Sequence, residues 1–211
     1  MSQESFLELL DRRVAATNLA VGPAVRAKLD HYFRLLAHWN NRINLTSLPL
    51  EPPTAQAIER LIIEPVRAAP LIASNVAIWF DLGSGGGSPA IPLQLVHPAK
   101  RLILVESRDR KAAFLREVLR ALPVDGAEVE VSRIELVTGR SHNAGLADLV
   151  TVRAVRLDAS SLGQIQALLR FGGQAVLFGG HVTSEQLPRG LEISSVQRPP
   201  SEIVVVTRTG A

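Results

Sequence analysis

The stretch from Ile78 to Pro92, which reads IWFDLGSGGGSPAIP, constrains the fold more than any other part of the chain. An apolar run ends in Asp81, four glycines follow within five positions, and Ser88 and Pro89 open a new apolar run. This order predicts a strand, a glycine turn and a helix, with Ser88 as N-cap and Pro89 as the first helical residue. Glycine lets a ligand approach the main chain, so the turn is predicted to bind a nucleotide-like ligand. The alternative is a surface turn without a ligand.

The composition is that of a globular protein without a metal site or membrane segment. With 211 residues, 46% of them hydrophobic, the chain is long enough for one substantial core and a small extension. It has no cysteine, and its five histidines include no H-x-x-x-H pair, so no metal is expected. No apolar run reaches the roughly 18 residues of a membrane span, and the first residues are acidic rather than basic. We therefore expect a cytoplasmic protein, and a monomer by default.

The basic residues are almost all arginine, and the lysines are confined to Lys28, Lys100 and Lys111. Arginine makes bidentate contacts with phosphate and stacks on bases, which suits an RNA partner. The alternative is a compositional bias that replaces lysine by arginine throughout the chain.

The N-terminal third predicts helices and no strand. Apolar residues recur at helical spacing over residues 5–17, 23–40 and 54–69, and Pro65 is expected to kink or end the third of these helices. We therefore expect residues 1–72 to form an N-terminal helical extension and residues 73–211 to form the second domain.

A polar stretch, WNNRINLTS at residues 39–47, follows the second predicted helix and is expected to be a loop. Its amide, guanidinium and hydroxyl side chains make Asn40, Arg42, Asn44 and Thr46 candidates for substrate binding. The same side chains are common in helix caps and turns, and that alternative is open.

From residue 76 onward, strands alternate with helices. Alternation of this kind predicts a doubly wound, mostly parallel sheet, here of seven strands, with the last two forming an antiparallel C-terminal hairpin. Ligands bind such α/β sheets at the carboxyl ends of the strands. The predicted strands are 76–80, 101–105, 128–131, 147–152, 174–178, 191–197 and 202–207, and the predicted helices are 90–97, 109–122 and 157–170.

Acidic residues at the strand ends narrow the choice of ligand. The glycine turn lacks the following Lys-Ser/Thr of a P-loop, so a kinase or ATPase is not expected. A dinucleotide enzyme fits the glycine spacing, but Asp81 would repel a pyrophosphate and favour a cationic ligand such as S-adenosylmethionine. Glu106 would then bind the ribose hydroxyls, and Ile134 with Glu135 would flank the adenine. The alternatives are that Asp81 caps the turn and that Glu106 is a solvated strand end.

Four motifs occur in order along the chain: WNNRINLTS at 39–47, DLGSGGGSPAIPL at 81–93, LVESRDRKAAFLREV at 104–118 and SRIE at 132–135. Together they resemble the RsmG or GidB family of bacterial small-subunit ribosomal RNA guanine-N7 methyltransferases. The resemblance spans about residues 29–180 and implies a Rossmann-like class I methyltransferase core with an N-terminal helical part, S-adenosylmethionine as cofactor, and ribosomal RNA or the small ribosomal subunit as partner.

The resemblance also implies roles for single residues. Arg153 corresponds to an arginine after the fourth strand and is expected to position the cofactor or the guanine. Guanine N7 has a lone pair and carries no proton, so methyl transfer needs alignment rather than a general base. The expected cofactor contacts are Asp81, Gly83, Gly85, Gly87, Ser88, Glu106, Ile134, Glu135 and Arg153.

The chain departs from the family at three places. Leu61 and Glu64 stand where the family has a histidine and an aspartate, residues 177–181 lack a lysine, and residues 153–156 read RAVR. Two alternatives therefore accompany the main interpretation. One is a methyltransferase of the same fold acting on another RNA base or a small molecule, and the other is a non-catalytic RNA-binding or assembly protein.

Overall fold

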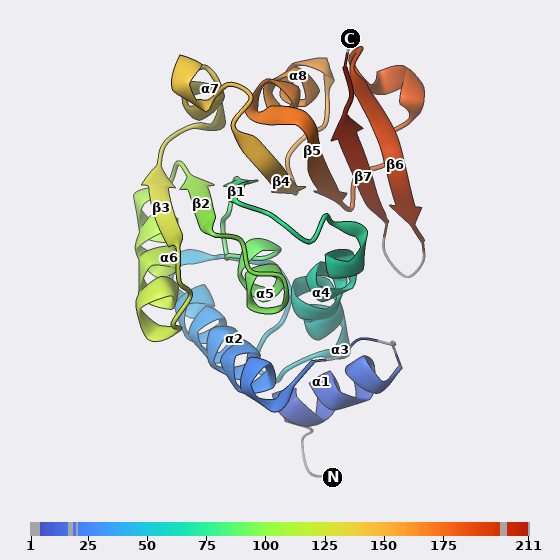
Figure 1. Cartoon of the computed structure of the whole chain (residues 1–211). Helices are drawn as coiled ribbons and strands as arrows, with labels where there is room; N and C mark the ends of the chain where they lie inside the picture. The colour runs from blue at the N-terminus through green and yellow to red at the C-terminus, as the bar shows by residue number, and fades with distance from the viewer. Residues whose placement is uncertain (1–4, 17–18, 20, 199–201, 211) are drawn as a thin grey trace.

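The protein is built around one seven-stranded sheet, shown in Figure 1. In this computed structural model the described residues are 5–16, 19, 21–198 and 202–210. The strand order is β3-β2-β1-β4-β5-β7-β6; the first five strands in that order are parallel, and β7 runs antiparallel to both β5 and β6. The strands are β1 Ile78–Leu82, β2 Arg101–Glu106, β3 Ala127–Val131, β4 Ala147–Arg153, β5 Leu169–Phe178, β6 Leu191–Gln197 and β7 Ile203–Arg208.

The sheet confirms the prediction of a doubly wound fold with a C-terminal hairpin. Strand β1 pairs with β2 on one side and with β4 on the other, so the winding direction reverses next to β1. Leu82 is paired with Val105 and with Val152, which brings the carboxyl ends of β1, β2 and β4 together. Ligands of open α/β sheets bind at such a reversal point.

Helices cover both faces of the sheet. Alternate residues of each strand enter different cores: Trp79 and Leu102 face the helices α5 and α6, whereas Phe80 and Ile103 face α7 and α8. This alternation follows from the two-residue period of a strand. The bounds are α5 Ala90–Val96, α6 Asp109–Ala121, α7 Ile134–Thr138 and α8 Ala159–Leu168, with short 3-10 turns η3 Ser141–Asn143 and η4 Ser184–Gln186.

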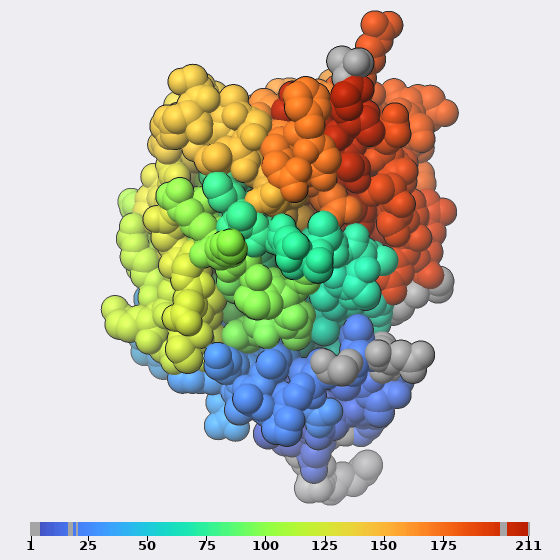
Figure 2. All heavy atoms as spheres, viewed as in Figure 1, coloured from blue at the N-terminus to red at the C-terminus, as the bar shows by residue number. Residues whose placement is uncertain are grey.

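The N-terminal helices pack against the α5 and α6 side of the sheet, as the blue and green segments of Figures 1 and 2 show. Buried residues of these helices, Tyr32 and Phe33 among them, share one hydrophobic cluster with Trp79 and Phe114. The packing is continuous across the predicted boundary after residue 72, and the division into two domains stays a prediction. The elements are α1 Phe6–Ala15, α2 Pro23–Ile43, α3 Ala55–Ile58, the π-helical segment η1 Glu59–Ile63, α4 Glu64–Ala68 and the 3-10 turn η2 Ala69–Leu71.

Helix α2 is longer than predicted. It continues through the polar stretch to Ile43, because Trp39 and Ile43 extend its apolar stripe and pack against the core. Asn44 then ends the helix in a left-handed conformation, with φ of 51°, and its N–H donates to the Asn40 carbonyl. Packing of the apolar stripe outweighs the low helix propensity of asparagine here.

Pro65 was expected to kink or end the regular part of its helix, and the regular α-helix is indeed interrupted before it, by the π-helical segment η1 between α3 and α4. Two other local predictions were wrong. The glycines at 172 and 173 lie inside β5, which begins at Leu169 beside Ala147, and α8 ends at Leu168. Ser88 is not a helix cap: Pro89 is the residue before α5, and no side chain caps that helix.

No helix within the described residues has the length and apolarity to cross a bilayer.

Candidate active site

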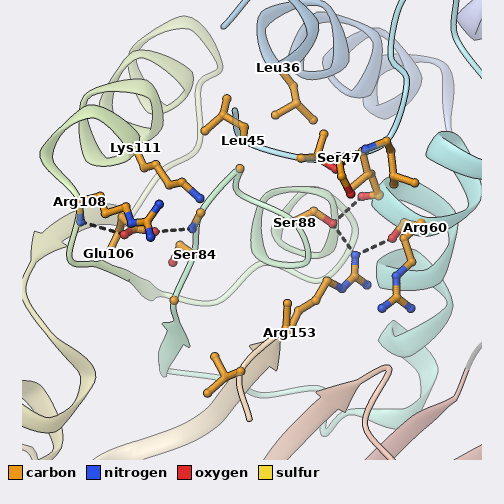
Figure 3. A pocket seen from close by; sticks show the side chains of 18 residues that line it. Leu36, Leu45, Ser47, Arg60, Ser84, Ser88, Glu106, Arg108, Lys111 and Arg153 are labelled. Carbon is orange, nitrogen blue, oxygen red and sulfur yellow. Dashed lines mark hydrogen bonds between the residues drawn. The ribbon is translucent and has the colours of Figure 1, made fainter. Parts of the chain in front are cut away.

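A cavity of about 550 Å³ opens over the carboxyl ends of β1, β2 and β4. Its wall combines four parts of the chain: the glycine loop after β1, the start of α6, the loop after β4, and the N-terminal segments around Thr46 and Arg60 (Figure 3). These parts are far apart in the sequence and meet only because the winding of the sheet reverses here. The cavity lies where the sequence predicted a ligand.

The glycine loop is held open by main-chain hydrogen bonds. The N–H groups of Gly83 and Ser84 donate to the Val105 carbonyl at 2.9 and 3.0 Å. Gly87 has φ of +83°, and a Cβ there would lie 3.0 Å from Ile91 Cγ1, so only glycine fits. The Tyr32 hydroxyl of α2 donates to the Gly86 carbonyl at 2.6 Å, which ties the loop to the N-terminal helices.

Glu106 ends β2, lines the cavity and is hydrogen-bonded to the glycine loop beside it (Figure 3). Its Oε2 accepts from the N–H of Gly85 at 2.9 Å and its Oε1 from the N–H of Arg108 at 2.8 Å, so both oxygens are fixed in place. Each carboxylate oxygen can accept a further hydrogen bond. The side chain is therefore oriented to accept from neighbouring hydroxyl groups of a ligand.

Asp81 lies beneath the glycine loop, outside the cavity wall. It is buried, and its Oδ1 accepts from the Thr151 hydroxyl at 2.5 Å, while Oδ2 is buried without a partner among the described residues. Burial raises the pKa of the Asp81 carboxyl to about 6, against the lowering effect of the Thr151 hydrogen bond. The predicted contact between Asp81 and a ligand stays a prediction, and the structure places this side chain one layer below the cavity.

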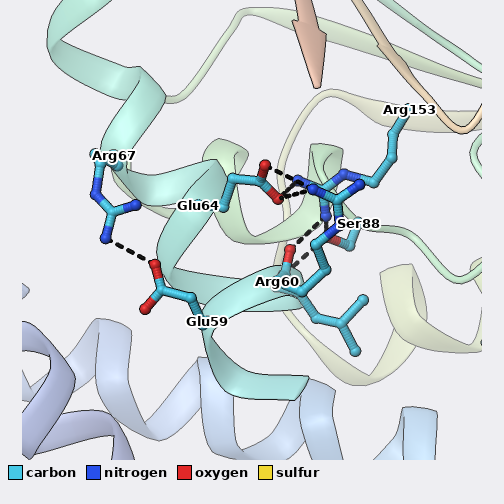
Figure 4. A network of polar contacts seen from close by, with 7 residues as sticks. Glu59, Arg60, Glu64, Arg67, Ser88 and Arg153 are labelled. Carbon is cyan, nitrogen blue, oxygen red and sulfur yellow. Dashed lines mark hydrogen bonds and ion pairs between the residues drawn. The ribbon is translucent and has the colours of Figure 1, made fainter. Parts of the chain in front are cut away.

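Arg153, at the end of β4, is at the centre of a buried polar network (Figure 4). Its Nη1 donates to the Arg60 carbonyl at 2.5 Å and to Ser88 Oγ at 2.9 Å, and its Nη2 donates to Glu64 Oε2 at 2.8 Å. The guanidinium also lies 4.7 Å from the centre of the Phe178 ring. Burial lowers the pKa of Arg153 to about 10, and the Glu64 carboxylate opposes this, so the group is charged at neutral pH.

Pro65 makes this network possible by lacking an N–H group. In an α-helix its N–H would bond to the Leu61 carbonyl, and in the π-helical register of η1 it would bond to the Arg60 carbonyl. With both bonds missing, Leu61 O accepts from Ser88 Oγ at 2.8 Å and Arg60 O accepts from Arg153. The two freed carbonyls therefore attach this helix to the glycine loop and to β4.

Ile134 and Glu135, at the start of α7, line a neighbouring cavity of about 220 Å³. Val155 belongs to the walls of both cavities. A Cβ on Gly83 would lie 3.4 Å from Val155 and 3.9 Å from Ile134, so Gly83 is at the junction of the two spaces. The structure thus brings the predicted adenine contacts next to the glycine loop.

The polar stretch after Trp39 contributes less to the site than the substrate prediction assumed. Of its four candidates, only Thr46 lines the cavity. Asn40 Oδ1 accepts from the N–H groups of Leu45 and Thr46 at 2.7 and 2.8 Å, which is a capping role. Arg42 and Asn44 are exposed outside the cavity wall. For Asn40 the structure supports the alternative of a cap.

Three basic residues of the wall were not singled out from the sequence: Arg60, Arg108 and Lys111. Arg108 and Lys111 lie at the start of α6, and neither forms an ion pair with another described residue. Arg108 and Lys111 follow Glu106 by two and five residues, and this closeness to the end of a strand could have identified them as residues of the site. Arg60 had none, because its place depends on the π-helical segment. No cluster of potential metal ligands occurs in the part of the chain that the structure describes.

Comparisons with known proteins agree with this geometry. A solved structure of a mutant of MtNAS in complex with S-adenosylmethionine has a TM-score of 0.54 at 13% identity, covering 97% of this chain and 73% of that chain, which shows a shared fold. Proteins named Ribosomal RNA small subunit methyltransferase G are closer in sequence. The one from Xanthomonas euvesicatoria pv. vesicatoria (strain 85-10) is 34% identical over 192 residues, 89% of this chain and 84% of the relative. The one from Sorangium cellulosum (strain So ce56) is 31% identical over 209 residues, 98% of this chain and 84% of the relative.

A family match covers most of the chain as well. Residues 25–206 match GidB, described as rRNA small subunit methyltransferase G. The match includes the glycine loop, Glu106 and Arg153, the residues around which the cavity is built. With this match and relatives above 30% identity along most of its length, the chain belongs to the GidB family of rRNA small subunit methyltransferase G proteins.

Proposed function

We propose that this protein is an S-adenosylmethionine-dependent methyltransferase that transfers a methyl group to guanine N7 of small-subunit ribosomal RNA. Family membership supports the reaction and the RNA. The observation that supports this cofactor is the placement of Glu106, whose two oxygens are fixed at the end of β2 beside the glycine loop, in the wall of the cavity.

The residues around the cavity fit S-adenosylmethionine. Glu106 binds the ribose hydroxyls, because a carboxylate can accept from both of them. Ile134 and Glu135 hold the adenine in the neighbouring cavity, and the glycine loop leaves room for the amino-acid part. The unpartnered Oδ2 of Asp81 adds a negative charge below the loop, which favours a cationic ligand. When bound, this cofactor supplies an activated methyl group.

The protein positions the acceptor and performs no proton transfer. Guanine N7 attacks with its own lone pair, so the site needs alignment and exclusion of competing orientations. Arg153 has the most central position, but its guanidinium is charged at neutral pH and cannot accept a proton. Its role is to fix the glycine loop through Ser88 and the N-terminal helix through Glu64.

The RNA partner approaches from the side of α6. Arg108 and Lys111 line the cavity without an ion-pair partner among the described residues, so their charges are available to phosphate. We assign the reaction to the cytoplasm, where ribosomal RNA is found, with naked RNA or the small subunit as its substrate.

Two measurements test this function. Calorimetric titration with S-adenosylmethionine should give one site per chain, and absence of binding would exclude a methyltransferase. Mapping of 7-methylguanosine in ribosomal RNA from cells with and without the gene should show one modification that depends on it. An identical modification pattern in both strains would exclude the proposed substrate.

A further inference from the structure

A further cavity of about 220 Å³ lies between the ends of β4 and β5, next to the proposed cofactor site. Its walls share Arg60, Ala154 and Val155 with the main cavity, so the two spaces adjoin at these residues. Leu157 and Phe178 supply apolar walls on the other side. A planar group in this cavity, which we call the acceptor cavity, would therefore lie beside the ligand in the main one.

Two glycines after β5 shape the acceptor cavity. A Cβ on Gly179 would lie 2.4 Å from Arg60 Nη2, and a Cβ on Gly180 would lie 2.4 Å from Leu157 Cδ1. Neither position can carry a side chain without displacing its neighbour. The main chain of Gly179 and Gly180 therefore forms this edge of the cavity, and the Arg60 guanidinium occupies the space that a side chain on Gly179 would need.

The Arg60 guanidinium is fixed along one edge only. Its Nη1 donates to both oxygens of Glu64, at 2.9 and 3.1 Å, and Glu64 is fully buried. Its Nη2 points toward Gly179 and has no hydrogen-bond partner in the described part of the chain. The side chain is 38% exposed and lines both cavities, and Figures 3 and 4 show it beside Arg153.

We propose that the acceptor cavity receives the target guanine and that Arg60 Nη2 donates a hydrogen bond to guanine O6. The proposal rests on the function proposed above and adds the residue that recognises the base. Apolar walls from Leu157 and Phe178 suit a base that has been turned out of its stack. The partner is a guanine, because O6 is an acceptor, whereas adenine presents an amino donor at the same position.

Binding through a single donor matters for the chemistry. A free arginine commonly binds O6 and N7 of guanine together with its two terminal nitrogens. Here Glu64 holds Nη1, so the two terminal nitrogens cannot bind O6 and N7 together, and binding of O6 by Nη2 leaves the N7 lone pair free. In the transfer step the N7 lone pair forms the bond to the methyl carbon while the methyl–sulfur bond breaks and its electron pair returns to sulfur. The guanine becomes cationic and no proton moves.

The test uses the full chain, S-adenosylmethionine and small-subunit ribosomal RNA. Arg60→Ala and Arg60→Lys should each lower kcat/KM for methyl transfer at least about tenfold, because the donor to O6 is lost or displaced. Their affinity for S-adenosylmethionine, measured by calorimetry, should stay that of the wild type. The control is Arg34→Ala, which removes a different i,i+4 ion pair, with Asp30, on a 73% exposed side chain of α2.

A second pair of variants displaces Arg60 without removing it. Gly179→Ala and Gly145→Ala both place alanine at a positive φ, +69° and +65°, but nothing lies within 4 Å of a Cβ at Gly145. Both should lose similar stability, and only Gly179→Ala should also lose methyl transfer.

Three results would overturn the inference. If the wild type methylates the RNA and the Arg60 variants do so at the same rate, Arg60 does not recognise the base and the proposed function stands. If the Arg60 variants lose cofactor affinity in parallel with their rate, the residue has only a structural role. If the wild type binds the cofactor but transfers no methyl group to this RNA, both the inference and the proposed RNA substrate fail.

Discussion

Glu64 and Arg153 form an ion pair that is closed off from solvent, with Nη2 and Oε2 2.8 Å apart and side chains that are 0% and 9% exposed. The pair joins a helix that precedes the sheet to the last residue of β4. The same carboxylate also binds Arg60, so one buried negative charge balances two guanidinium groups. Few other contacts in the described structure connect so many parts of the site.

Glu64→Gln should destabilise the protein by about 3 kcal/mol, because it leaves the buried charge of Arg153 without a counter-ion. Chemical denaturation in urea at neutral pH measures the change. Glu117→Gln is the control, since Glu117 and Arg120 form a long, exposed pair at 3.9 Å whose loss should cost little. Equal stability of the two variants would contradict a structural role for the buried pair.

Glu106→Ala should weaken binding of S-adenosylmethionine at least about tenfold, through loss of the hydrogen bonds to a charged acceptor. Isothermal calorimetry gives the affinity, and circular dichroism checks that the fold is retained. Glu128→Ala removes an exposed carboxylate from the neighbouring strand, where it pairs with Arg101, and should leave the affinity unchanged. The cofactor site would be misplaced if both variants bound equally well.

Asp81 should make the free energy of unfolding depend on pH. Its pKa is raised from 3.8 to about 6 in the folded protein, chiefly by burial, so the folded state holds the proton more tightly than the unfolded state. The contribution of Asp81 to the free energy of unfolding is fully present below pH 4 and is lost, by about 3 kcal/mol, as the pH rises to 6 and above. Asp81→Asn lacks this titration, so its stability relative to the wild type should increase from pH 4 to pH 7. Urea unfolding across that range measures it, and a constant difference would contradict the raised pKa of the buried carboxyl.

Removal of Arg108 and Lys111, the two cations at the start of α6 that line the cavity, should weaken RNA binding. In an Arg108→Ala, Lys111→Ala double variant, the slope of log affinity against log salt should become shallower by about 1 to 2, since fewer counterions are released from phosphate. Filter binding or fluorescence anisotropy with ribosomal RNA gives the slope. Arg116→Ala, farther along α6, is the comparison, and a slope that drops equally in that variant would indicate a diffuse charge effect.

The sequence predicted those parts of the molecule that depend on local order. The order of residues from Ile78 to Pro92 predicts a strand, a glycine turn and a helix. Glu106 could be placed at a strand end because it directly follows an apolar run. The doubly wound sheet followed from the alternation of strands and helices, whereas the position of the reversal next to β1 comes from the strand order of the structure. For this reason the fold and the position of Glu106 beside the glycine loop were both predictable.

The other half of the site depends on contacts that no local pattern encodes. Arg60 and Arg153 are 93 positions apart, and they meet because a π-helical segment and Pro65 leave a carbonyl free. The sequence also does not show how deeply a side chain is buried. Asp81 was correctly placed at the end of β1, but nothing in the sequence indicates that its carboxyl lies below the cavity. The polar side chain of Asn40 made it a candidate for substrate binding, but its hydrogen bonds in the structure are those of a helix cap.

The bond from the Tyr32 hydroxyl to the Gly86 carbonyl has a consequence for binding affinity. A loop with four glycines in five positions loses much conformational entropy when it is fixed. Here α2 holds the loop from one side, and Ser88 anchors its end to the Leu61 carbonyl. The loop is therefore preorganised by folding, and the ligand does not have to order it. The helices before the sheet thus favour ligand binding by holding the glycine loop in place.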